Sequence, residues 1–249
     1  MSVSGLQEQD LSYVCPHLEV PLAVVCFYWI GDRWRNDGWG ARYINALYRG
    51  VRSHLLVKDY DFICFTNEKL EGLDGKIQVR PFESPSPKGV LPRMWMFSEE
   101  SGLFGRQVLA LDLDIIVVGC LGDIASYSGP FCARSKFLSG EEWKLDGDVT
   151  SFRAGEENCK RFWTPLRDDP IAVEDITGGR ERYWFRYVVG TRGGDRWDKV
   201  CPGQVVSYKR HVRSRDNHLP PNARIVSCHG TPRPHQLERF PWVRSNWNG

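Results

Sequence analysis

The first half of the chain alternates short apolar runs with segments in which apolar residues recur at helical spacing. The runs predict buried strands, because a strand covered on both faces reads as continuous apolar sequence. These strands are expected at residues 22–29, 61–66, 76–79 and 108–118. Helices are expected at 41–55 and 94–104, the second after a proline-rich loop at 81–92. This order of elements predicts an α/β fold with a Rossmann-like, mostly parallel sheet flanked by helices.

Beyond residue 119 the pattern is less regular. Short strands are expected at 131–133, 149–153, 205–208 and 224–228. Residues 1–20 are expected to form an irregular leader, and residues 30–40 a polar loop after the first strand. A chain of 249 residues can bury a sizeable core, and no linker separates two parts, so we expect a single domain.

Charge and composition indicate which partners and which cellular compartment to expect. The net charge of +2 gives no overall attraction to nucleic acid, although residues 207–249 carry eight Lys and Arg against two acidic residues. Such a basic stretch is either a solvated surface or a site for phosphates. The eight cysteines form no Cys-x-x-Cys pair, which favours a reducing compartment. No signal peptide is evident in residues 1–20, and no apolar stretch approaches the ~18 to 20 residues of a membrane span, so we expect a cytoplasmic protein.

Asp112 and Asp114 are two carboxylates inside the apolar run at 108–118. Positions two apart in an extended strand point the same way, so both side chains can converge at the strand's end, where open α/β sheets bind ligands. Paired carboxylates repel each other unless positive charge lies between them, and Mg²⁺ or Mn²⁺ would supply it. Alternatively, both acids merely cap the strand and either face solvent or pair with arginines. The motif by itself does not decide between these interpretations.

Further candidates lie at other strand ends. Tyr28 and Trp29 follow the first strand and could stack on a nucleobase or pack in the core. His229 follows the last strand, and an imidazole beside carboxylates favours Mn²⁺ over Mg²⁺. Arg233 and Lys209 could hold phosphate charge. A metal ion on the two aspartates and the histidine would neutralise a departing diphosphate, as transfer of a sugar from a nucleotide-diphosphate donor requires.

The span Leu22–His235 resembles a GT-A glycosyltransferase of the kind related to glycosyltransferase family 8. The similar segments are Tyr43–Tyr48 with Phe62–Asn67, Arg93 followed by Met96–Phe97, Leu111–Asp114, Ser207–Lys209 and His229–Pro234. The D-x-D motif at Asp112–Asp114 is weak evidence alone. Followed in the right order by the segment His-Gly-Thr-Pro-Arg-Pro, it becomes a fairly strong indication.

The resemblance implies a GT-A fold, a Mn²⁺ or Mg²⁺ ion, and a nucleotide-sugar donor, favouring UDP, that gives its sugar to an unknown acceptor with retention of configuration. The implied metal ligands are Asp112, Asp114 and His229. The implied nucleotide-sugar-binding residues are Phe27, Tyr28, Trp29, Arg93, Asp112, Leu113, Lys209, Gly230 and Arg233. In the single domain at 1–249, residues 21–119 would bind the nucleotide and residues 120–249 the sugar and acceptor.

Two segments depart from the family pattern. Asp146–Val149 stands where relatives carry an Asn-Ser-Ser-like strand, and Gly178–Arg180 stands where they carry Gly-Asp-Gln. These changes imply another sugar, a different acceptor or reduced activity. The candidates for a catalytic carboxylate are Asp146, Asp148 and Glu181. The alternative for each is that it is an ordinary carboxylate on the protein surface.

The sequence bears on three other functions. A haloacid-dehalogenase-like phosphatase also ends a strand with D-x-D, but there the motif follows the first strand and a hydroxyl or small residue follows the second Asp. Here Ile115 and Ile116 follow the motif, and the motif comes after the fourth strand, so this function is excluded. Nucleic-acid binding through Lys209–Arg215 is not expected, because that run lacks interleaved aromatics for base stacking. A protein that binds nucleotide sugars but has lost transfer remains the alternative to a metal-dependent glycosyltransferase.

Overall fold

The computed structural model describes most of the chain beyond the N-terminal segment. The described residues are 20–31, 39–57, 59–137, 140, 144–190 and 193–247. Nearly all of the leader expected at 1–20, and most of the loop expected at 30–40, therefore lie outside the described residues. None of the described helices has both the length and the apolar character needed to cross a bilayer.

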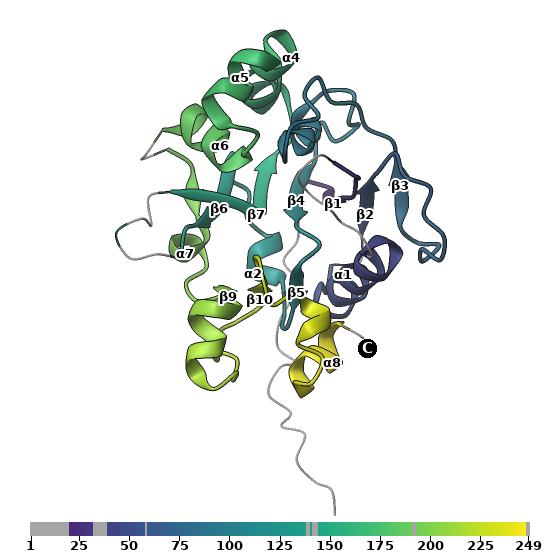
Figure 1. Ribbon diagram of the computed structural model, residues 1–249, viewed down its shortest axis with the longest axis vertical. Coiled ribbons are helices and arrows are strands. Elements are labelled where there is room, and N and C mark those ends of the chain that lie inside the picture. The colour runs from purple at the N-terminus through teal and green to yellow at the C-terminus, as the bar shows by residue number, and fades with distance from the viewer. Residues whose placement is uncertain are drawn as a thin grey trace, which may run out of the picture.

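A seven-stranded sheet forms the centre of the molecule (Figure 1). In spatial order its strands are β3 (Gln78–Arg80), β2 (Tyr60–Phe65), β1 (Leu22–Phe27), β4 (Gln107–Leu111), β7 (Leu145–Arg153), β6 (Phe131–Ser135) and β8 (Asp195–Arg196). Every neighbouring pair is parallel except β4–β7 and β6–β7. The predicted mostly parallel α/β sheet is thus confirmed.

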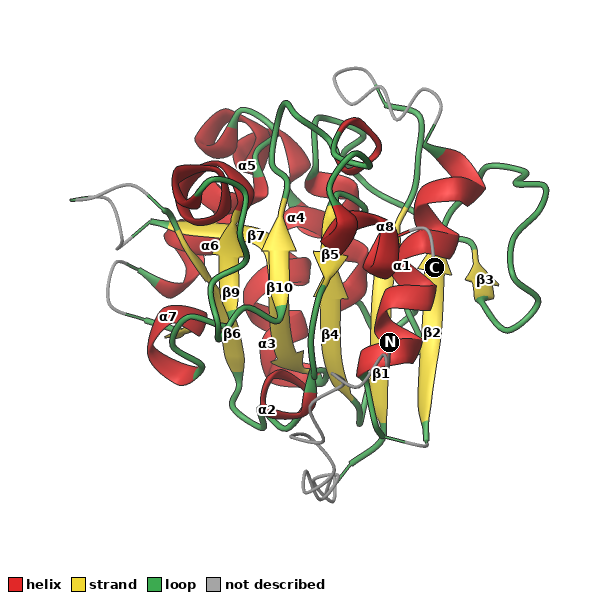
Figure 2. Cartoon of the chain, turned by 90° about the horizontal axis from the view of Figure 1, so that it is seen from below, coloured by secondary structure: helices red, strands yellow, loops and turns green. Residues whose placement is uncertain are grey.

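A second layer covers one face of this sheet, as the view from below shows (Figure 2). It contains a three-stranded sheet of β5 (Ile115–Val117), β10 (Ile225–Ser227) and β9 (Val205–Ser207), with helices α1 (Gly40–His54), α2 (Gly122–Ala125) and α8 (Pro241–Trp247). Apolar residues of α1, β5, β9 and β10 form one buried core with one side of the large sheet. The predicted helix at 41–55 agrees with α1 to within one residue, because its apolar positions follow one helical face.

The opposite face of the large sheet is covered mainly by short helices, at the top of Figure 1. These are η1 (Leu91–Phe97), α3 (Glu156–Asn158), η2 (Cys159–Trp163), α4 (Thr164–Asp168), α5 (Pro170–Thr177) and α6 (Glu181–Val189). The remaining short helices are α7 (Trp197–Val200), η3 (Tyr208–Val212), η4 (Arg213–Arg215) and η5 (Pro234–Gln236). The rings of Phe97, Phe131, Phe162 and Phe185 pack together in this second core, in stacked, tilted and edge-on pairs.

Two predicted elements are wrong in extent. The strand expected at 108–118 is two strands in different sheets, because β4 pairs with β1 and β7, whereas β5 pairs antiparallel with β10. A turn joins them, closed by a hydrogen bond from the Ile115 backbone N–H to the Asp112 carbonyl at 3.3 Å. The helix expected at 94–104 is a 3₁₀ helix that ends at Phe97, and Gly102 and Gly105, both with positive φ, form turns after it.

Candidate functional site

A pocket of about 400 Å³ opens at the carboxyl ends of β1 and β4. The chain runs from β1 to β2 and β3 on one side and then returns to place β4 on the other side of β1. This reversal of strand order leaves a crevice in which open α/β sheets bind ligands. The pocket is lined by Phe27, Trp29, Trp39, Val90, Arg93, Asp112, Leu113, Asp114, Arg134, Asp146, Gly147, Asp148, Arg180, Glu181, Arg182 and His229.

Arg93 joins three segments of the pocket wall. Its guanidinium, on η1, lies 2.7 Å from an oxygen of Asp112 and 2.7 Å from Oε1 of Glu181. It also donates a hydrogen bond to the Gly147 carbonyl at 3.0 Å. Arg93 is 4% exposed, so its charge is held away from bulk water. One buried cation therefore holds the D-x-D turn, β7 and the start of α6 together.

Asp114 meets a different cation. Arg233 forms an ion pair with its carboxylate and also lies over the ring of Trp39, 4.7 Å from the ring centroid. Burial, followed by repulsion from Asp112, raises the pKa of Asp114 to about 7, although Arg233 opposes the shift. Both aspartates are thus placed in one pocket by a turn, and not by the extended strand that the sequence pattern predicts.

His229 is close to this pair of aspartates without joining it. Its Nε2 lies 2.8 Å from the hydroxyl of Ser207 on β9. Burial, and then Arg134, lowers the pKa of His229, so the ring is neutral near pH 7. Among the described residues, no three His, Cys, Asp or Glu side chains form a group that could hold a metal ion. The two aspartates suit a divalent cation by their chemistry and convergence, whereas His229 as placed does not complete the set.

A second network lies on the other side of the pocket. Arg134 on β6 holds Asp148 through its Nε at 2.6 Å and Asp146 at 3.0 Å. Burial raises the pKa of Asp148, but Arg134 and a hydrogen bond from Ser227 outweigh it and lower that pKa below its usual value. Asp148 is therefore an ionised carboxylate already engaged by three residues, because the Val149 N–H also donates to it at 3.1 Å.

Glu181 differs from these two carboxylates. Its Oε1 is bound to Arg93, but its Oε2 is buried without a hydrogen-bond partner, in a side chain that lines the pocket. Burial raises the pKa of Glu181 to about 8 despite Arg93. Gly147 makes this position possible, because a Cβ there would collide with the Glu181 carboxylate and lie 3.0 Å from Phe185.

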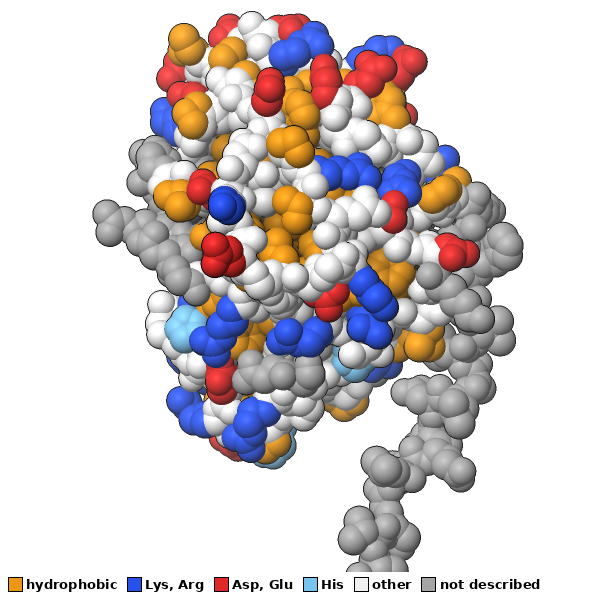
Figure 3. Space-filling view, turned by 90° about the vertical axis from the view of Figure 1, so that its right-hand side faces the viewer, with side chains coloured by type: hydrophobic (Ala, Val, Ile, Leu, Met, Phe, Trp, Pro, Cys, Tyr) orange, Lys and Arg blue, Asp and Glu red, His pale blue; other side chains and the backbone are white. Residues whose placement is uncertain are grey.

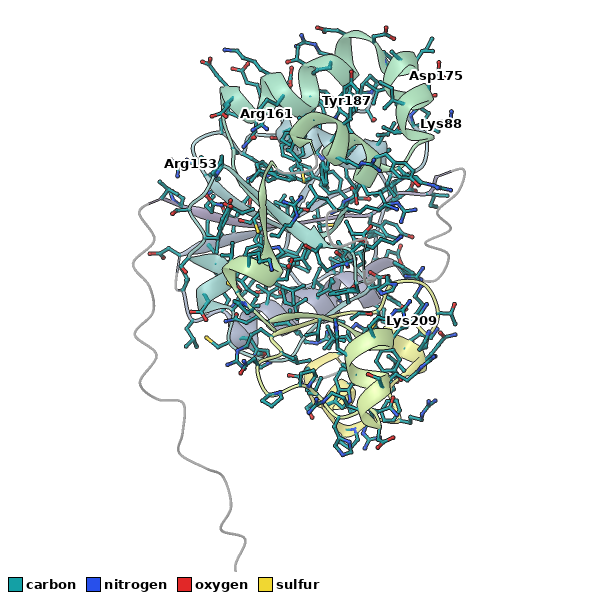
Figure 4. All side chains as sticks on the ribbon, turned by 90° about the vertical axis from the view of Figure 1, so that its left-hand side faces the viewer. Lys88, Arg153, Arg161, Asp175, Tyr187 and Lys209 are labelled. Atoms are coloured by element: carbon teal, nitrogen blue, oxygen red, sulfur yellow. The ribbon has the colours of Figure 1, made fainter. Side chains whose placement is uncertain are left out.

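The other residues implied by the resemblance divide into two groups. Phe27, Trp29 and Leu113 line the pocket. Tyr28 is buried in the core under α1, and Lys209 and Gly230 lie outside the pocket lining, next to each other. Figure 4 labels Lys209 in the lower, C-terminal part of the molecule.

Sequence reasoning missed Trp39 and Arg134. Trp39 follows a polar loop and gave no periodic signal, since it lies just before α1. Arg134 did leave a signal, because it is a single charge within the apolar strand Phe131–Ser135. A buried arginine in a strand needs a buried carboxylate partner, which Asp148 supplies.

Comparison with known proteins matches the chain to solved structures. No family model matches the chain, and no curated protein does. The glycosyltransferase GlyE of Streptococcus pneumoniae TIGR4, in its apo form, matches with a TM-score of 0.59 at 14% identity, over 93% of this chain and 62% of GlyE. This chain therefore spans less than two thirds of GlyE's length.

Two further solved structures are similar. The galactosyltransferase LgtC, solved with donor and acceptor sugar analogs, matches with a TM-score of 0.59 at 11% identity, over 91% of this chain and 96% of LgtC. The bifunctional glycosyltransferase WbbM matches with a TM-score of 0.56 at 10% identity, over 93% of this chain and 52% of WbbM. At these identities the likeness concerns the fold, and the chain has the GT-A fold of these glycosyltransferases.

Proposed function

We propose that the chain is a glycosyltransferase that moves a sugar from a nucleoside-diphosphate donor, with UDP as the expected nucleotide, to an acceptor. One observation carries the proposal: Asp112, Arg93 and Glu181 are bonded together on the wall of a 400 Å³ pocket at the strand-order reversal. The likeness to GlyE, LgtC and WbbM supports the same reading.

Aromatic side chains supply the nucleotide end of the proposed site. Phe27 at the end of β1, Trp29 just after it and Trp39 just before α1 all line the pocket. Phe27 is fixed by stacking on Phe65 at 4.9 Å and against Phe82 at 5.6 Å. Rigid aromatic faces of this kind suit a nucleobase, because base stacking needs a flat partner that does not reorganise.

Fixed positive charge supplies the diphosphate end. When the sugar leaves, negative charge grows on the diphosphate, and preorganised cations stabilise that charge in the transition state. Arg93 and Arg233 lie on either side of the D-x-D turn and serve this purpose. A Mn²⁺ or Mg²⁺ ion on Asp112 and Asp114, when bound, would add Lewis-acid stabilisation of the same leaving group.

Glu181 is the candidate carboxylate for direct contact with the sugar. Asp148 is saturated by its partners, and Asp146 is held by Arg134, whereas Glu181 keeps a buried oxygen for a hydroxyl group. Retention of anomeric configuration belongs to the proposal through the resemblance to family 8.

Calorimetric titration of UDP, GDP and a panel of UDP-sugars, with Mn²⁺ and with EDTA, tests the proposal. We expect one nucleotide to bind, and Asp114→Asn to weaken its metal-dependent binding by at least tenfold. Asp175→Asn is the matched control, because Asp175 is an exposed carboxylate at the upper end of the molecule (Figure 4) and does not line the pocket. No nucleotide binding in either condition, or unchanged affinity in Asp114→Asn, would overturn the proposed site.

A second function is favoured by the altered segments at Asp146–Asp148 and Gly178–Arg180. If they prevent transfer, the chain binds nucleotide sugars without turnover. An assay of donor hydrolysis, in which the released nucleoside diphosphate is measured, separates the two functions. Tight donor binding with no release across the panel would favour the binding protein.

A further inference from the structure

A second, larger cavity adjoins the proposed donor pocket. Its volume is about 670 Å³, and Arg134 lines both cavities. Two aromatic rings lie between them: His229 belongs to the donor pocket, Phe137 lines the second cavity, and their ring centroids are 6.2 Å apart. A molecule in the second cavity would therefore lie one side-chain layer from the donor.

The lining of this cavity is basic. Arg134, Lys136, Arg210 and Arg215 contribute positive charge. Among the described residues that line it, Asp198 is the single acid, and the Ser135 hydroxyl donates a hydrogen bond to its carboxylate. Arg134 is already bound to Asp146 and Asp148, so the charge considered for a ligand is that of Arg210 and Arg215. On the face in Figure 3, Lys and Arg side chains lie in the lower half, where the C-terminal elements lie, and also in the upper half.

His211 adds a neutral donor to the same lining. The Ser207 backbone N–H donates to its Nδ1 at 3.0 Å, which leaves the ring proton on Nε2. Burial lowers the pKa of His211, so the ring stays neutral near pH 7. Val205, Val206 and Pro220 provide apolar walls beside these polar groups. A cavity with apolar walls and a few convergent polar groups is typical of a small-molecule site.

The structure also explains the basic run at Lys209–Arg215. Helices η3 and η4 bring Arg210, His211 and Arg215 to the cavity. Arg213 belongs to the same run but lies outside the cavity lining. A merely solvated basic run would not concentrate these side chains around a cavity beside the donor pocket. The run therefore has a specific position relative to the proposed reaction.

We propose that this second cavity binds the acceptor through an anionic group, a phosphate or a carboxylate, with Arg210 and Arg215 as its charged partners. The assignment to the acceptor rests on the proposed glycosyltransferase function, and the preference for an anion rests on the cavity alone. Arginine side chains suit both anions, because their planar donors match pairs of oxygen atoms.

Glucose 6-phosphate, glucuronate and neutral glucose are the probes. Titrated at fixed ionic strength without donor, the phosphate or the carboxylate sugar is expected to bind at least tenfold more tightly than glucose. The double variant Arg210→Gln/Arg215→Gln should lose at least tenfold of that affinity, and Arg213→Gln should leave it unchanged. The comparison of the two anionic sugars identifies which group the cavity prefers.

Three results would overturn the proposal: equal binding of charged and neutral sugars, no binding of any probe, or the same loss in Arg213→Gln. A UDP titration keeps this outcome separate from the proposed function. The double variant should bind UDP like the wild type, and Asp114→Asn should still bind the anionic sugar. If the anionic sugar binds but does not change donor turnover, the assignment to the acceptor falls and the anion site stands.

Discussion

At the residue scale, one buried arginine holds each of the two carboxylate networks of the proposed donor pocket. Arg93 balances Asp112 and Glu181, while Arg134 balances Asp146 and Asp148. Each buried cation is shared by two acids, but burial raises the pKa of Glu181 to about 8, so Glu181 is largely protonated near pH 7 and Arg93 is not fully neutralised. In the proposed function, a diphosphate therefore meets Arg93 and Arg233 as its cations, each of them already paired with one aspartate of the D-x-D turn.

Gly147→Ala tests the spacing of this pocket at the residue scale. The new Cβ would collide with the Glu181 carboxylate, so we expect a loss of about 1–3 kcal/mol in the free energy of unfolding. Donor affinity should fall with it, because Glu181 would leave Arg93. Gly155→Ala is the matched control, since a Cβ there meets nothing within 4 Å and the backbone is extended. Denaturant unfolding of the two variants measures the difference, and equal stabilities would contradict the role given to Gly147.

At the scale of elements, β6 is a strand that carries an ion-pair network into the core. Arg134 is 4% exposed, and its partner Asp148 is 6% exposed. Removing one member of a buried pair is costly, because it leaves the other charge without a partner. The Arg134 network thus joins β6 to β7 as well as lining both cavities.

Arg134→Met should therefore lower the free energy of unfolding by about 3–5 kcal/mol. The control is Lys160→Met, which breaks an ion pair of similar length with Glu156 on the surface, where the two side chains are 72% and 78% exposed. We expect the control to unfold at the wild-type denaturant concentration. A small effect of Arg134→Met would show that Asp148 finds another partner or takes up a proton.

The elements also show how far sequence reasoning reaches. The strands β1 and β2 and the helix α1 were predictable, because apolar runs and helical spacing are local signals. The division of 108–118 was not, because β5 is set by its pairing with β10, which lies far away in the sequence. In the same way the sequence listed Arg93, Asp112 and Glu181, but only the tertiary fold brings them into contact.

At the scale of the whole molecule, the C-terminal helix closes on the first helix. Trp247 on α8 is 1% exposed and packs edge-on against Tyr43 of α1, with ring centroids 5.1 Å apart. Arg49 of α1 donates a hydrogen bond to the Trp247 carbonyl at 3.2 Å. Trp39, which lines the donor pocket, stacks on the same Tyr43 at 4.6 Å. The packing of α8 thus supports the pocket through Tyr43, which contacts both Trp247 and the pocket residue Trp39.

Trp247→Ala should lower the free energy of unfolding by about 3–5 kcal/mol, because it empties a packed position between two helices. Tyr187→Ala is the control, since Tyr187 is 64% exposed and its truncation should cost less than about 1 kcal/mol. Thermal unfolding of both variants compares them. Matching melting temperatures would mean that α8 does not support the fold.

The turn between β4 and β5 has a consequence for the way the molecule opens. The backbone carbonyl of Asp114 accepts a hydrogen bond from the Cys228 N–H at 3.1 Å, directly after β10. We therefore expect the D-x-D turn to open when the small sheet opens, and to stay closed when the small sheet is intact. Local opening that exposes the amides of β9 and β10 to hydrogen exchange would also dismantle the donor pocket, so the C-terminal third and the site form one cooperative unit.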